Sequence, residues 1–195
     1  MTVRDILKIT LTLVIIYLAG GVILASVYSV TSPVIYKLNK MEKEQALKEM
    51  MPDADKIEKL GDWTLRDKPA EYFVAKKGDD VTGYIVQSYG KGFGGYLTLL
   101  IAIDKDLRIQ KVKILSHKET PGFIENVNSD KFLGQFKEKG LDNIKLVKVE
   151  TTEHIQAVTG ATVSSRGVAT GAREGLIFLI DTLKGGIKNE NPPKG

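Results

Sequence analysis

Cysteine is absent from this sequence of 195 residues, and histidine occurs only twice, as His117 and His154. Without cysteine the chain has no disulfide, no thiolate nucleophile and no cysteine ligand for an iron–sulfur cluster or a c-type haem. Two histidines are too few for a three-histidine zinc site, so we expect no metal site. Any redox chemistry of this chain therefore requires a bound organic cofactor.

Runs of charge of one sign are lacking as well. The 28 basic and 24 acidic residues are interspersed along the chain, and the formal net charge is only +4. No cluster among them resembles a nucleic-acid-binding patch, so we expect no nucleic-acid partner and at most some attraction to anionic lipid headgroups. The length and the 43% hydrophobic content suit one domain of ordinary size with a short appendage.

A long apolar run lies near the N-terminus, where Ile9 to Val30 contains no charged residue. As a helix this run would span about 33 Å, which matches the hydrocarbon core of a bilayer. We predict an uncleaved, single-pass transmembrane helix. A signal peptide is the alternative, but the run is longer than a typical apolar signal region and no clear cleavage site follows it. Basic residues flank both ends, so charge leaves the orientation open.

The rest of the chain is predicted to form one α+β domain. We expect the N-terminus and the membrane anchor in residues 1–33, with Pro33 ending or kinking the helix. A helical connector is expected at 34–60, the domain at 61–188 and a disordered tail at 189–195. The predicted fold is thus one N-terminal transmembrane helix followed by a single domain with an antiparallel sheet and flanking helices.

Alternating apolar residues and turn residues locate the predicted elements of the domain. We expect two hairpins, with strands at 71–76 and 81–88 around Gly78-Asp79-Asp80, and at 96–103 and 107–115 around Asp104-Lys105-Asp106. Further along, we expect a short helix capped at Ser129-Asp130 and stopped at Gly140, a strand at 144–149, and a last helix from about Ser165 to Lys184.

The segment Thr159-Gly160-Ala161-Thr162-Val163-Ser164-Ser165 precedes this last helix. The free N–H groups and the positive end of the helix dipole favour an anion there, and a phosphate suits that geometry. The residues alone also fit a plainer interpretation, in which Ser164 or Ser165 caps the helix and Thr162 is a turn residue.

Thr159 to Thr162 resembles the flavinylation motif of the FMN-binding domain family. That family includes the G subunit of the Rnf complex, a ferredoxin:NAD oxidoreductase, and the C subunit of the sodium-pumping NADH:quinone reductase. The resemblance implies that Thr162 carries FMN covalently as a phosphoester, installed by a flavin transferase with FAD as donor. The neighbours implied to bind the cofactor are Thr159, Gly160, Ala161, Val163 and Ser164. The motif normally opens with Asp six positions before the modified threonine, where this chain has Gln156.

Two other segments carry the same resemblance. His117-Lys118-Glu119-Thr120-Pro121-Gly122 is similar to the family's E-T-P-G loop, which implies that Glu119 and Thr120 lie near the flavin ring. The residues themselves predict a type II turn at Thr120-Pro121-Gly122-Phe123, and His117 is expected to be structural or exposed. Gly90 to Tyr96 is similar to the family's glycine-rich approach to the sheet, in which Gly94 and Gly95 allow a flat ligand to come close; a plain glycine-rich hairpin loop is the alternative.

The resemblance implies a membrane-anchored redox relay of an Rnf-type complex, with no catalytic residue of its own. Its implied partners are the other integral-membrane and iron–sulfur Rnf subunits and the flavin transferase, and its implied place is the cell (inner) membrane with the domain on the extracytoplasmic side. The C subunit of the sodium-pumping reductase is one alternative. Another is an assembly or sensory module with this fold and no flavin, which Gln156 favours. A free-standing flavin reductase is disfavoured because no dinucleotide-binding fingerprint is present.

Overall fold

The computed structural model describes residues 3–185, which divide into two units at Glu44 and Gln45. Helix α1 (Val3–Met50) contributes to both units. The first unit is α1 as far as Glu44, and the second contains the end of α1, all the strands and the remaining helices. The domain therefore begins within the last turns of α1.

In the part of the chain that the structure describes, α1 is the one helix long and apolar enough to cross a membrane. Its most apolar window of 18 residues has a mean hydropathy of 2.3 and is not buried by any other part of the protein. The hydroxyl groups of Thr12 and Ser26 donate to carbonyl oxygens one turn earlier, at 2.9 and 2.8 Å, so they add no unsatisfied polar group to this surface. An N-terminal helix of this kind fits a single-pass membrane anchor.

A five-stranded antiparallel sheet forms the centre of the domain, and its strands follow one another in chain order. Its strands are β1 (Lys56–Leu65), β2 (Lys68–Lys77), β3 (Asp80–Lys91), β4 (Tyr96–Asp104) and β5 (Ile109–Ser116). Their interiors alternate apolar residues between the two faces, as a sheet buried on both sides requires.

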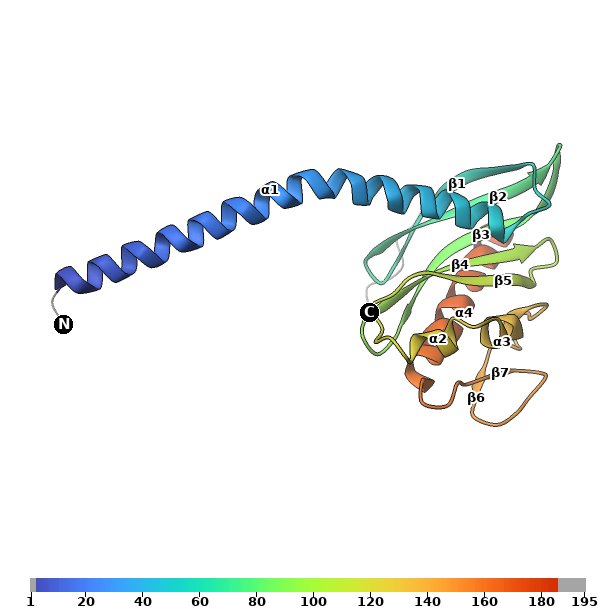
Figure 1. Cartoon of the computed structure of the whole chain (residues 1–195). Helices are drawn as coiled ribbons and strands as arrows, with labels where there is room; N and C mark the ends of the chain where they lie inside the picture. Colours follow the sequence, from blue (N-terminus) through green and yellow to red (C-terminus); the bar gives the residue numbers. More distant parts are fainter. Residues whose placement is uncertain (1–2, 186–195) are drawn as a thin grey trace. The chain divides into compact units, whose positions relative to one another are not determined.

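Short elements and one long helix follow the sheet. They are α2 (Ile124–Val127), α3 (Asp130–Leu133), the 3₁₀ helix η1 (Gly134–Phe136), the parallel strands β6 (Leu146–Val147) and β7 (Ile155–Gln156), and α4 (Thr162–Gly185). Figure 1 shows α4, in orange and red, on one side of the sheet, and the last turns of α1, in cyan, on the other.

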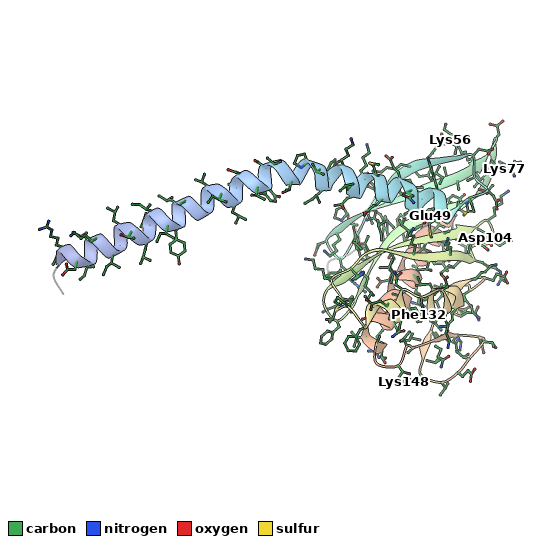
Figure 2. The ribbon with its side chains drawn as sticks, in the orientation of Figure 1. Glu49, Lys56, Lys77, Asp104, Phe132 and Lys148 are labelled. Carbon is green, nitrogen blue, oxygen red and sulfur yellow. The ribbon has the colours of Figure 1, made fainter. Side chains whose placement is uncertain are left out.

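Each face of the sheet has its own apolar core. On the α4 face, Leu99, Ile101 and Leu176 belong to a large cluster that also includes Phe132 from α3. On the opposite face, Leu47 and its neighbours in the last turns of α1 pack on the sheet. Glu49, labelled in Figure 2, forms an ion pair with Lys113 of β5 at this second face. The domain is thus built of three layers.

The predicted α+β class, the hairpins and the antiparallel sheet are confirmed. Ser129 is the predicted cap, since its side chain accepts a hydrogen bond from the N–H of Phe132 at 3.3 Å. The predicted type II turn is confirmed as well, because Gly122 has φ +92° and the Phe123 N–H donates to the Thr120 carbonyl at 3.3 Å.

Several predicted boundaries are wrong. An end of the helix at Pro33, one of the two predicted outcomes, is wrong, because α1 continues through this residue to Met50. A chain that is helical on both sides tolerates the one N–H bond that a proline removes. Residues 56–60 open β1 where a helical connector was expected, since the turn at Met51 to Ala54 ends the helix. The sequence did not indicate this strand, because its apolar residues, such as the half-exposed Leu60, do not alternate clearly with polar ones.

Three further boundaries differ beyond the sheet. The helix capped by Ser129 gives way to η1, which ends at Phe136 and not at Gly140. The strand expected at 144–149 is reduced to β6. Helix α4 begins at Thr162, directly after Ala161, so Ser164 and Ser165 lie inside the helix and neither is its N-cap. The expected tail at 189–195 lies outside the described residues.

Candidate functional site

Three segments that are far apart in the sequence meet at the carboxylate of Glu119. Its Oε1 atom accepts a hydrogen bond from the Gly94 N–H at 2.8 Å, and its Oε2 atom accepts one from the Phe93 N–H at 3.2 Å. The hydroxyl of Ser164, in the first turn of α4, donates to the same Oε2 atom. We call this set of four residues the Glu119 junction. It joins the glycine-rich loop, the E-T-P-G loop and the helix that begins at Thr162.

The Glu119 junction holds a buried negative charge. The residues Glu119 and Ser164 are only 7% and 3% exposed. Burial raises the pKa of Glu119, but the hydrogen bonds from Ser164, Gly94 and Phe93 outweigh burial and hold the pKa below its ordinary value. The carboxylate is therefore ionised at neutral pH and acts as a fixed acceptor.

Thr162 is the first residue of a helix of 24 residues, and its side chain is partly exposed. The first turn of a helix leaves its N–H groups without partners in the helix. Within the described part of the chain, only the N–H of Ser165 in this turn finds one, the carbonyl of Ala161 at 2.9 Å. The start of α4 thus presents free N–H groups beside the Thr162 hydroxyl, which is the geometry an anion requires.

The loop before Thr162 is closed by Ser165. Its buried hydroxyl accepts a hydrogen bond from the Val158 N–H at 3.1 Å and donates one to the Ala161 carbonyl at 2.9 Å. Between these anchors Gly160 has φ +80°, a left-handed conformation that favours glycine. Thr159, Gly160 and Val163 are exposed, whereas Ala161 is buried. The predicted residues of this segment therefore form one ordered, accessible corner.

The glycine-rich loop packs closely on the segment that carries Glu119. A Cβ atom on Gly92 would lie 2.4 Å from the Oε1 atom of Glu119, and one on Gly94 would lie 2.1 Å from the Lys118 carbonyl oxygen. Both contacts are closer than a side chain permits. Phe93 between them is 82% exposed, although its N–H points to Glu119, so it is not a core residue.

Gln135 of η1, which no sequence motif indicates, holds the backbone of Gln156 in β7, shortly before Thr162. Its side-chain oxygen accepts from the Gln156 N–H at 2.7 Å, and its side-chain nitrogen donates to the Gln156 carbonyl at 3.3 Å. Gln135 thus takes the place of a second neighbouring strand for β7, which already pairs with β6. No spacing in the sequence relates these two residues, which lie 21 positions apart.

A hollow of about 450 Å³ is lined in part by Gly94 and Gly95. Its wall includes Lys68, whose Nζ atom is 4.6 Å from the centre of the Tyr96 ring. His117, predicted to be structural or exposed, is exposed at the rim of this hollow. Gly94 therefore belongs to the Glu119 junction and, with Gly95, also lines a basic, aromatic hollow.

Comparison with known proteins matches residues 92–177 to the FMN-binding domain. The chain is 36% identical to the G subunit of the proton-translocating ferredoxin:NAD(+) oxidoreductase complex of Clostridium ljungdahlii, over 94% of this chain and 96% of the relative. The chain belongs to the family of these G subunits. Another member, the G subunit of the ion-translocating oxidoreductase complex of Methanosarcina acetivorans, is 29% identical over 90% of this chain and 95% of the relative.

The Na(+)-translocating ferredoxin:NAD(+) oxidoreductase complex of Acetobacterium woodii also contains a G-family relative, 28% identical over 86% of this chain and 88% of the relative. Among solved structures, the crystal structure of Shewanella oneidensis NqrC is similar in fold, with a TM-score of 0.51 and 22% identity over 70% of this chain and 74% of that chain. The matched domain contains the whole Glu119 junction and Thr162.

The residues of this G-family chain fit FMN. A phosphate requires hydrogen-bond donors and a point of attachment, and the first turn of α4 offers free N–H groups beside a partly exposed threonine hydroxyl. The heterocycle requires apolar surface, and Phe93, Phe123 and Val163 have exposed apolar side chains. The donors and the apolar side chains occur on the three segments that the Glu119 junction brings together.

Proposed function

We propose that this chain carries FMN as a phosphoester on Thr162 and relays electrons within an Rnf-type complex. As a G-family chain with an FMN-binding domain and an apolar N-terminal helix, it is a membrane electron-transfer subunit. Its partners are the integral-membrane and iron–sulfur subunits of that complex. A flavin transferase attaches the cofactor, in a step that replaces the proton of the Thr162 hydroxyl by the FMN phosphoryl group and releases AMP from FAD.

One observation supports this proposal most strongly. Thr162 is the first residue of α4, where N–H groups are free, and it lies within the residues that match the FMN-binding domain. The free N–H groups of the turn bind the phosphate, with Gly160 and Ala161 shaping the turn. Glu119, Thr120, Thr159, Val163, Ser164, Gly94 and Gly95 are the other proposed binding residues. FMN, when bound, supplies the ability to take up and release single electrons.

A covalent tether suits a relay on the extracytoplasmic side, where we propose that the domain lies, because a dissociated flavin is not readily replaced there. The location of the domain can be tested directly by cysteine labelling, because the chain has no native cysteine that would react with the reagent. Lys148 lies in the exposed loop between β6 and β7 (Figure 2). Lys148→Cys should react with a membrane-impermeant maleimide in intact cells. Labelling only after the cells are opened would place the domain in the cytoplasm.

The flavin proposal is tested by in-gel flavin fluorescence of the denatured protein, expressed in full length with a flavin transferase. A covalent flavin remains on the denatured band, whereas a bound but unattached flavin is lost. Wild-type protein should fluoresce and Thr162→Ala should not. A dark wild-type band would instead favour the assembly or sensory module without flavin, for which Gln156 is the supporting residue.

A further inference from the structure

We propose that Glu119 is a positioning residue for the flavin attachment, acting through Ser164 on the first turn of α4. The inference rests on the proposed function of Thr162. In this role the carboxylate fixes where the turn that bears Thr162 lies, so that the threonine hydroxyl and the free N–H groups face the incoming phosphate together.

The connection between the two residues is short and direct. Ser164 lies two positions after Thr162 in the same helical turn, and its hydroxyl donates to Glu119. The side chain of Ser164 is therefore turned inward, while those of Thr162 and Val163 reach the surface. A shift of the carboxylate would rotate this turn and move Thr162 with it.

The carboxylate itself has little freedom to shift. Two backbone N–H groups, of Phe93 and Gly94, hold its oxygens from the other side. A Cβ atom on Gly92 would lie 2.4 Å from Oε1, so the loop backbone is packed directly against the carboxylate. The loop between β3 and β4 thereby fixes the carboxylate, and the carboxylate in turn fixes the position of Ser164.

Hydrogen bonds, and not an ion pair with lysine or arginine, stabilise the negative charge of Glu119. Among the described residues no lysine or arginine forms an ion pair with Glu119, and the one side-chain hydrogen-bond donor recorded for it is Ser164. Hydrogen bonds to a charged group contribute more than neutral ones, and more so when both partners are buried. Loss of the Ser164 hydroxyl therefore removes the whole side-chain link between the carboxylate and α4.

Two variants test the link from its two ends. Ser164→Ala removes the donor, and Glu119→Gln replaces one accepting oxygen by an NH₂ group that faces donors. The control is Ser129→Ala, which removes the cap of α3 and lowers stability without touching the Glu119 junction. All are made in the full-length protein and compared by the rate of FMN incorporation, from intact mass at timed exposure to the transferase, and by the fluorescence anisotropy of the attached flavin.

We expect Ser164→Ala and Glu119→Gln each to slow FMN incorporation by about tenfold or more and to lower the anisotropy of the attached flavin. The double variant should be about as slow as either single one, because both remove one link. Ser129→Ala should match the wild type in both readouts, even at equal loss of thermal stability. Wild-type rates and anisotropy in both site variants would overturn this inference alone. A wild type without FMN would overturn the proposed function and this inference together.

Discussion

Gly90 of β3 and Gly167 of α4 lie so close together that a Cβ atom on Gly90 would be 1.9 Å from the Gly167 carbonyl oxygen. Gly171, one turn further along α4, has the same role, since its Cβ would lie 3.0 Å from the Gly90 N atom. The buried hydroxyl of Ser88 donates to the Gly171 carbonyl at 2.7 Å across this contact. The helix that begins at Thr162 is thus fixed on the sheet backbone to backbone.

Gly90→Ala should lower the free energy of unfolding by about 2 to 3 kcal/mol, because the new methyl group forces strand and helix apart. Gly134→Ala is the matched control, since Gly134 has no atom near its Cβ position and a helical backbone. It should change stability by less than about 0.5 kcal/mol. Thermal or urea unfolding of the full-length protein in detergent measures both. Equal stability of the two variants would show that the close contact does not hold α4.

Gly160→Ala should reduce FMN incorporation, since φ +80° costs an alanine about 1 kcal/mol or more in the corner before Thr162. No atom lies near its Cβ position, so the cost comes from the backbone conformation and not from a clash. Gly160→Asn, which tolerates this conformation better, should recover most of the incorporation. Intact mass after a fixed labelling time reports both, and an alanine variant labelled as fully as asparagine would contradict the explanation.

Gln135→Leu should leave the backbone of Gln156 without both of its side-chain partners and cost about 1 to 3 kcal/mol of stability. Gln135→Glu keeps an acceptor for the Gln156 N–H but has no donor for its carbonyl, so its effect should be intermediate. Hydrogen exchange of the Gln156 amide is the measurement. Faster exchange is expected in the leucine variant and less change in the glutamate variant; slow exchange in both would exclude the role given to Gln135.

Acidification should weaken the Glu119 junction. The pKa of Glu119 lies below its ordinary value of 4.5 in the folded protein, so its contribution to stability is present above that value and is lost as the pH falls through the folded pKa. The melting temperature of the wild type should therefore fall more steeply below pH 4.5 than that of Glu119→Gln, which has no proton to gain. Glu58, whose pKa is lowered to about 2 by hydrogen bonds and charge from Lys56 and Lys76, contributes equally to both proteins. Parallel curves would contradict an ionised Glu119.

The sequence predicted the elements of the sheet because their signals are local. Gly78 and Asp104 mark the turns of the two hairpins, and the strands on either side alternate or are continuously apolar. Strand β1 gave no such signal, because four charged residues interrupt its apolar ones and it lies at the edge of the sheet. The position of β1 depends on its pairing with β2, and a local sequence pattern carries no information about that pairing.

The site was predictable in part for the same reason. Thr162, Glu119 and Gly94 each lie in a short segment with a recognisable pattern, but the pattern does not tell which atoms meet. That Glu119 bonds to Ser164 and to two backbone N–H groups depends on contacts between residues 25 to 45 positions apart. Gln135 was missed, and Ser165 was expected only as a possible helix cap, because their side chains bind backbone atoms, which any sequence possesses.

Intact mass spectrometry of the full-length protein, purified from membranes that contain its flavin transferase, tests the attachment at Thr162 most directly. The wild type should carry an added mass equal to FMN less one water, located by fragmentation on the peptide that contains Thr162. Thr162→Ala should have the unmodified mass, while Thr152→Ala, at an exposed threonine outside the proposed binding residues, should still be modified. An unmodified wild type, or an FMN mass that survives in Thr162→Ala, would contradict the account.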